Sequence, residues 1–255
     1  ELMAQWQAVG FSHGVMNTDN MSILGLTLDY GPFGFLDAFD PGYVCNHSDT
    51  GGRYAFDQQP DVAAWNITKL AQTFVPLLSV ETASAAIADY PQQFGQAYIA
   101  RMAAKFGLPA SGETVPLLMD GLQLLAQNHV DYTIFMRRLC DFDSASEAVN
   151  APLRDLFLDR AAFDAWAQRY AAALRQTGSG NKERGTAMRA VNPKYILRNH
   201  LAEVAIRRAA DDRDYSEINR LHQLLARPFD EQPENEAYAA EPPDWARKIE
   251  VSCSS

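Results

Sequence analysis

The sequence is short of basic residues, and this shortage excludes one broad class of protein. Lysine and arginine together number 22 against 32 acidic residues, which gives a formal net charge of −10. Sequence-independent binding to nucleic acid needs a basic surface that displaces counterions, so no nucleic-acid partner is expected. Net charge averages over the whole surface, however, and a small basic pocket for a triphosphate remains compatible with this composition.

Long apolar runs are also missing, because every apolar stretch is short and broken by polar residues. A helix needs about 18 to 20 apolar residues to cross a bilayer, so no membrane span is expected. The opening residues, Glu1 to Trp6, resemble the middle of a helix without a start methionine or a cap. We therefore expect a piece of a longer chain, in which an absent targeting signal carries no weight.

Cysteine is scarce, with only Cys45, Cys140 and Cys253 in the chain. Three widely separated cysteines cannot form a disulfide framework, and no Cys-x-x-Cys pair suggests a zinc site. A phosphate-binding glycine loop is missing too, because Gly178–Gly180 does not follow an apolar strand. The chemistry must therefore be sought elsewhere in the chain.

What is present predicts a folded, mainly α-helical protein. Hydrophobic residues make up 47% and charged residues 21% of 255 residues, enough for one large or two small domains. Apolar residues recur at helical spacing in 61–78, and again in 82–106 with a break near Pro91 and an end at Gly107. We expect a small β-hairpin followed by a helical bundle, and an extended tail over 228–255, which is rich in proline and acids.

The segment from His13 to Gly31 carries the chemistry. Met21–Leu28 is rich in isoleucine and leucine and bounded by turn formers, which predicts a short buried strand or hairpin. A hairpin would bring Asn20 and Asp29 together at its open end. One carboxylate, one amide oxygen and several waters or phosphate oxygens suit Mg²⁺, and Mn²⁺ accepts the same set. Asp19 could then accept a proton from an attacking hydroxyl, with His13 orienting the loop by hydrogen bonding.

Such an arrangement is typical of kinase-type phosphoryl transfer, where a base Asp, a metal-binding Asn and a strand-end Asp before Gly work together. The match is partial, because protein kinases place the first two about five residues apart, whereas Asp19 and Asn20 are adjacent. Asp-Asn and Asp-x-Gly also occur in turns where they only satisfy the backbone. From spacing alone, a structural turn and a metal site are equally supported.

Longer motifs resemble the selenoprotein O family. They are the run from His13 to Pro60, HGVMNTDNMSILGLTLDYGPFGFLDAFDPGYVCNHSDTGGRYAFDQQP, then Asn192–Tyr195 with Arg198 and Asn199, the run Pro228–Glu236, and the terminal Ser252–Ser255. The resemblance covers essentially the whole chain and implies a protein-kinase-like fold. Residues 1–227 would be its C-lobe, with a catalytic loop at 13–20, a metal-binding Asp-Tyr-Gly at 29–31, an activation-like loop at 32–60 and a helical bundle at 61–227.

The resemblance implies a protein adenylyltransferase that moves AMP from ATP to serine, threonine or tyrosine hydroxyls of proteins. By motif, Asp19 would be the proton acceptor, Asn20 and Asp29 would bind Mg²⁺, and Asp29 would also lie against the nucleotide. Two alternatives stay open: γ-phosphoryl transfer as in a kinase, which needs the same residues, and a non-catalytic pseudokinase scaffold.

The same resemblance implies an N-terminal lobe with a glycine-rich segment, a lysine–glutamate pair and arginines that hold the phosphates. None of these is recognisable here, so we expect the isolated chain to be inactive and its missing lobe to be a partner. The family also implies redox regulation by a disulfide between Cys45 and Cys253; from sequence alone, two distant free cysteines are the alternative. The expected compartment is the cytoplasm for a bacterial source and the mitochondrion for a eukaryotic one.

Overall fold

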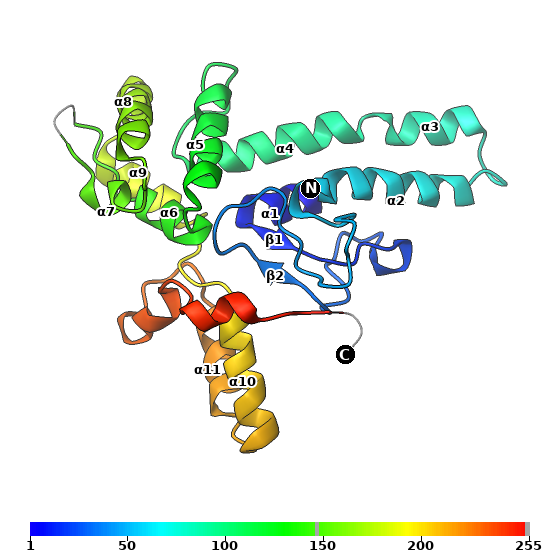
Figure 1. Cartoon of the computed structure of the whole chain (residues 1–255). Coiled ribbons are helices and arrows are strands. Elements are labelled where there is room, and N and C mark those ends of the chain that lie inside the picture. The colour runs from blue at the N-terminus through cyan, green and yellow to red at the C-terminus, as the bar shows by residue number, and fades with distance from the viewer. Residues whose placement is uncertain (146–147, 253–255) are drawn as a thin grey trace. The chain divides into compact units, whose positions relative to one another are not determined.

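A computed structural model describes residues 1–145 and 148–252 of the chain. The fold is mainly α-helical (Figure 1), which confirms the predicted class. The chain divides into two compact units. Unit 1 comprises Glu1–Gly34, Pro41–Arg101 and Glu250–Ser255, and unit 2 comprises Phe35–Asp40 and Met102–Ile249. Within the described ranges, no helix is both long and apolar enough to span a membrane.

Unit 1 begins with α1 (Leu2–Val9), which ends at Gly10 in the left-handed conformation with φ 74°. Glycine reaches this conformation without steric cost and therefore closes the helix. The chain then enters β1 (Phe11–Ser12), which pairs with β2 (Gly34–Phe35). Trp6 of α1 packs on the Phe11 ring with a centroid distance of 5.2 Å, so an apolar contact joins the helix to the strand.

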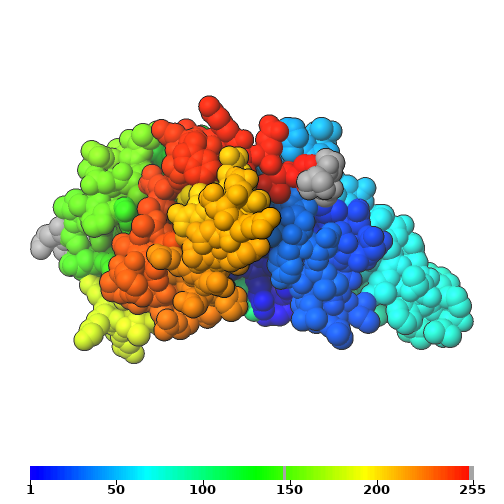
Figure 2. All heavy atoms as spheres, turned by 90° about the horizontal axis from the view of Figure 1, so that it is seen from below, coloured from blue at the N-terminus to red at the C-terminus, as the bar shows by residue number. Residues whose placement is uncertain are grey.

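The helical part of unit 1 follows a long loop. Its elements are η2 (Phe56–Gln58), α2 (Gln59–Thr73), α3 (Val80–Ala88) and the start of α4 (Tyr90–Lys105). Ser79 caps α3 by accepting a hydrogen bond from the Thr82 amide at 3.2 Å. Figure 1 shows α3 running back beside α2, and Figure 2 shows this cyan hairpin protruding beyond the blue residues of the same unit.

Unit 2 is built around buried aromatic rings. Its helices are α5 (Val115–Asn128), α6 (Tyr132–Leu139), α7 (Ala151–Arg154), α8 (Arg160–Thr177), α9 (Asn181–Arg189), α10 (Asn199–Asp211) and α11 (Ser216–Leu225). Trp166 and Tyr170 of α8 stack at 4.8 Å, and Phe106 meets the Trp166 ring edge-on at 6.2 Å. Each such ring buries a large apolar area, so this cluster contributes a large share of the hydrophobic stabilisation of the unit.

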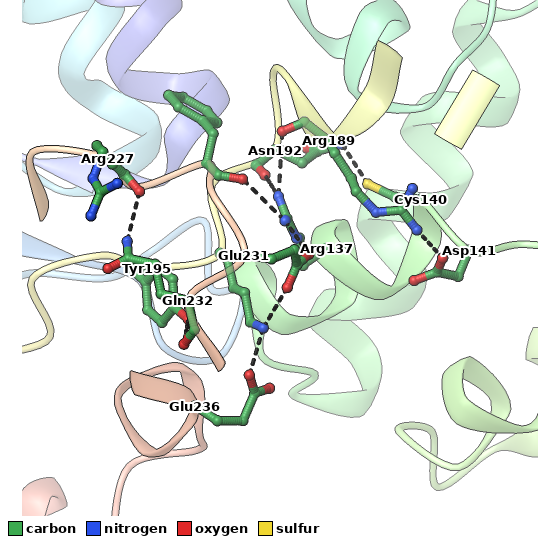
Figure 3. A network of polar contacts seen from close by, with 12 residues as sticks. Arg137, Cys140, Asp141, Arg189, Asn192, Tyr195, Arg227, Glu231, Gln232 and Glu236 are labelled. Atoms are coloured by element: carbon green, nitrogen blue, oxygen red, sulfur yellow. Dashed lines mark hydrogen bonds and ion pairs between the residues drawn. The ribbon is translucent and has the colours of Figure 1, made fainter. Parts of the chain in front are cut away.

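Two of the sequence motifs contact each other in unit 2. Lys194 forms ion pairs with Glu231 (2.7 Å) and Glu236 (2.6 Å), while the Tyr195 hydroxyl donates to the carbonyl of Gln232 at 3.0 Å. Arg137 of α6 joins them, as Figure 3 shows. The tail, expected to be extended, contains two short 3₁₀ helices, η3 (Pro233–Ala239) and η4 (Asp244–Lys248). The predicted division of the chain at residue 227 stays a prediction.

The predicted buried hairpin at Met21–Leu28 is wrong in two respects. Its strand pairing consists of a single antiparallel bridge between Met21 and Thr27, and the sheet forms between β1 and β2 instead. The segment is also open to solvent, with Ile23 81% and Leu24 78% exposed. Apolar composition predicts burial only if another element covers the segment, and the described residues provide no such cover.

Candidate functional site

Asp19 and Asn20 lie on a single turn of 3₁₀ helix, η1 (Thr18–Asn20), in unit 1. Asn17 precedes the turn with extended backbone, and its carbonyl accepts the Asn20 amide at 3.0 Å. The Asp19 side chain is exposed, and among the described residues no hydrogen bond or ion pair engages its carboxylate. The carboxylate is therefore accessible to an incoming group.

Asn20 and Asp29 lie side by side, as the sequence predicted. The Asn20 amide nitrogen donates to Asp29 Oδ2 at 2.7 Å and to the Val15 carbonyl at 3.1 Å. Asp29 itself has φ 59°, in the left-handed region that few residues other than glycine adopt. Asparagine and aspartate tolerate this region best, because their short polar side chains can bond locally.

The donor set fits a hard divalent cation that keeps much of its own coordination shell. Within the described residues, no group of three or more His, Cys, Asp or Glu side chains could hold a metal ion. The chain offers one carboxylate at Asp29 and one amide oxygen at Asn20. Mg²⁺ is usually bound in this way, through one or two protein oxygens together with waters and substrate phosphates.

His13 connects the backbone before η1 to the backbone directly before Asp29. Its Nε2 donates to the Leu28 carbonyl at 2.6 Å, while its Nδ1 accepts the Val15 amide at 3.3 Å. His13 is 1% exposed, and because its Nδ1 accepts a hydrogen bond, Nε2 is the nitrogen that donates. The predicted hydrogen bonding of His13 is confirmed, and it fixes the residue directly before Asp29.

Buried side-chain amides hold the backbone of the predicted catalytic loop, and no sequence motif indicated their role. Gln59 accepts the His13 amide through Oε1 and donates to the Phe11 carbonyl through Nε2, both at 2.9 Å. Asn66 donates to the Met16 carbonyl at 2.9 Å. The partners lie 46 to 50 residues apart in the chain, so no local motif reveals them.

Cys45 lies against the start of the same loop. The Cys45 side chain is buried and its Sγ contacts the Ser12 carbonyl at 3.5 Å. Gly14 has φ 79°, and a Cβ added there would come within 2.6 Å of the Cys45 sulfur, so only glycine fits. Cys253, the predicted disulfide partner, lies outside the described residues. The described part of the tail reaches the segment that carries Cys45, because the His47 amide donates to the Val251 carbonyl at 2.8 Å.

Comparison with known proteins identifies the class. Residues 1–226 match the family described as "Protein adenylyltransferase SelO". The chain therefore belongs to this family, which confirms the resemblance drawn from the motifs.

Individual relatives agree with this class. The chain is 80% identical to "Protein nucleotidyltransferase YdiU" of Thiobacillus denitrificans over 255 residues, which cover the whole chain and 52% of that relative. Proteins of the same name from Cupriavidus pinatubonensis and Burkholderia lata are 55% and 54% identical over 271 residues, again with 52% of each relative covered. The chain thus spans about half the length of the curated relatives it matches.

Proposed function

We propose that this chain is the catalytic C-terminal part of a protein adenylyltransferase that transfers AMP from ATP to serine, threonine or tyrosine hydroxyls of proteins. The observation that carries the proposal is the 2.7 Å contact between Asn20 and Asp29, with Asp19 on the adjoining position of the same turn. Membership of an adenylyltransferase family supplies the reaction class. A protein-kinase-like C-lobe, completed by an N-terminal lobe, is the architecture that we propose for the whole enzyme.

Each of the three residues has a separate task in this reaction. Asn20 and Asp29 would hold Mg²⁺ or Mn²⁺, and a bound cation neutralises charge on the phosphates and orients them. Asp19 takes the proton of the acceptor hydroxyl. The acceptor oxygen bonds to the α-phosphorus of ATP, the bond from that phosphorus to the β-phosphate oxygen breaks, and pyrophosphate leaves.

Isotope labelling of ATP separates this function from its closest alternative. The test protein is a chimera in which the amino-terminal half of the Thiobacillus denitrificans relative precedes Glu1, since 80% identity favours correct assembly. Incubation with an acceptor protein should transfer label from α-labelled ATP and none from γ-labelled ATP. Label from the γ position alone would establish a kinase, and binding of Mn²⁺ and ATP without any transfer would establish a pseudokinase scaffold.

Redox control and cellular location complete the proposal. The seating of the described tail beside His47 favours a regulatory disulfide between Cys45 and Cys253. Peptide mapping of oxidised and reduced protein would reveal or exclude this bond. The relatives are bacterial, which favours the cytoplasmic expectation over the mitochondrial one, and fractionation of cells that produce the protein would test it.

A further inference from the structure

Tyr54 follows the candidate metal ligands in the chain and contacts the turn that carries Asp19. Its hydroxyl donates to Asn17 Oδ1 at 2.6 Å. Tyr54 is 9% exposed, whereas Asn17 is exposed. Asn17 is the residue whose carbonyl accepts the Asn20 amide and so closes the turn. One side chain therefore connects the segment 41–55, which precedes η2, to the start of the candidate catalytic turn, within unit 1.

Tyr54 is itself held in place by a carboxylate. Asp49 Oδ2 accepts the Tyr54 amide at 2.8 Å, and Asp49 Oδ1 accepts the Arg53 amide at 3.0 Å. Charge-assisted bonds of this kind are stronger than neutral ones. The Arg53 guanidinium also lies over the Tyr54 ring at 5.6 Å. The ring is thus fixed by groups that do not depend on its hydroxyl.

We propose that Tyr54 is a positioning residue for the transfer reaction. Its hydroxyl anchors Asn17, and through Asn17 it fixes the turn that presents Asp19 and Asn20. This inference rests on the proposed function, since it assigns those two residues to catalysis. Tyr54 also connects the segment 41–55 to the turn of the proton acceptor, so a change in the conformation of this segment that moves Tyr54 would release the turn.

Removal of one oxygen atom isolates this contact. In the chimera described above, Tyr54→Phe keeps the ring and its burial but loses the bond to Asn17. We expect kcat for AMP transfer to fall about tenfold, the effect of one hydrogen bond, while KM for ATP stays within about twofold. Asn17→Ala should have the same effect, and the double variant should be no slower than either single one, because both remove a single interaction.

Tyr90→Phe is the matched control. The Tyr90 hydroxyl donates to the Pro60 carbonyl at 3.0 Å in the same unit, so its loss removes a similar bond away from the turn. This variant should keep the kcat of the parent chimera. If Tyr54→Phe and Tyr90→Phe have equal kcat values, or if the effects of Tyr54→Phe and Asn17→Ala simply add, the positioning role is wrong.

Hydrogen exchange tests the same role without any turnover. In the 255-residue chain, Tyr54→Phe should speed exchange of the Asn20 amide about tenfold, because the turn opens more often. Tyr90→Phe should leave it unchanged. An unchanged Asn20 amide in the folded Tyr54→Phe chain would overturn the inference. Absence of AMP transfer in the unsubstituted chimera would instead count against the proposed function, and the exchange result would still decide the role of Tyr54.

Discussion

Asp29 combines a candidate ligand role with an unfavourable backbone conformation. A non-glycine residue in the left-handed region costs about 1 to 2 kcal/mol, and Asp29 has φ 59°. Its hydrogen bond from Asn20 offsets part of that cost. Strained residues of this kind concentrate at functional sites, where the geometry serves the chemistry.

Substitutions at Asp29 should separate ligation from strain. Asp29→Gly and Asp29→Ala both remove the carboxylate, so both should lose Mn²⁺ binding in a titration followed by electron paramagnetic resonance. Glycine adopts the left-handed region freely and alanine does not. The free energy of unfolding of Asp29→Gly should therefore exceed that of Asp29→Ala by about 1 kcal/mol in denaturant titrations. Equal stability of the two variants would contradict the strain, and retained Mn²⁺ binding would contradict the ligand role.

Lys105 is a buried cation with unusual electrostatics. Its side chain is 2% exposed, and burial lowers the pKa of its ammonium group to about 7. In the unfolded chain the pKa is near its ordinary value of about 10.4. Between these two values the unfolded chain binds a proton that the folded chain lacks. Stability should therefore rise with pH across this window, and below about pH 7 the full cost of burying the charge applies.

Lys105→Met should remove this dependence. We expect the variant to be more stable than the parent at pH 7 by up to a few kcal/mol, and the difference to shrink toward pH 10. Lys182→Met, at an exposed position of α9, is the matched control, and its free energy of unfolding should differ little from that of the parent. Chemical denaturation at several pH values measures both. If the free energies of unfolding of the parent and of Lys105→Met varied with pH in parallel, the lowered pKa of Lys105 would be contradicted.

At the scale of elements, Arg198 joins three parts of unit 2. Its guanidinium bonds Asp131 at 2.8 and 3.2 Å, and also bonds Asp37 in the segment Phe35–Asp40. Asp131 in turn caps α6 by accepting the Ile134 amide at 2.9 Å. Arg198 is 1% exposed and stands directly before α10. One buried side chain therefore fixes the starts of two helices and the segment that interrupts unit 1.

Arg198→Met should destabilise unit 2 severely. Removal of one partner leaves carboxylates without their counter-charge, which typically costs about 3 to 5 kcal/mol for a buried pair. Arg169→Met is the control, because Arg169 pairs with Asp120 at an exposed site, where such pairs contribute below about 1 kcal/mol. In urea unfolding, the midpoint concentration should fall much further for Arg198→Met than for Arg169→Met. Similar shifts for both would refute the structural importance of Arg198.

The positions of proline and glycine explain which helix boundaries could be predicted from the sequence. The break near Pro91 and the end at Gly107 were correct, since α3 ends at Ala88, α4 begins at Tyr90, and Gly107 has φ 63°. The helix expected over 61–78 ends earlier, at Thr73. Pro76 accounts for this, because the residue before a proline avoids helical backbone and proline donates no hydrogen bond.

The site shows the same limit of sequence reasoning. Asn20 and Asp29 could be predicted to meet because they lie only nine positions apart and the chain between them reverses. The amide side chains of Gln59 and Asn66, and the hydroxyl of Tyr54, contact the loop from 37 to 50 residues away. Such contacts depend on tertiary packing, which periodicity and spacing do not encode. The exposure of Met21–Leu28 depends in the same way on what covers it.

At the scale of the whole molecule, the chain matches about half of each relative. The described residues place the candidate metal ligands and proton acceptor in unit 1, but the sequence contains no recognisable glycine-rich segment or phosphate-binding arginines. Binding of a triphosphate needs those cationic groups as well as the metal. The chain on its own is therefore expected to bind Mn²⁺ weakly and to transfer no AMP.

Comparison of the isolated chain with the chimera tests whether AMP transfer needs residues outside this chain. The 255-residue chain should show no label transfer from α-labelled ATP at any concentration, whereas the chimera should be active at the same protein concentration. Addition of the separate amino-terminal half to the isolated chain serves as a further arm. AMP transfer by the isolated chain would show that its own residues suffice to hold ATP.

The most direct test of the whole account measures AMP incorporation by three variants of the chimera. Asp19→Asn, Asn20→Ala and Asp29→Ala each remove one proposed function, and Asp89→Asn, at the exposed end of α3, removes a carboxylate outside the site. With α-labelled ATP, the first three variants should lose at least about a hundredfold in kcat, in line with removal of a catalytic base or metal ligand, while Asp89→Asn keeps full activity. Undiminished AMP transfer by folded Asp19→Asn and Asp29→Ala would contradict the account.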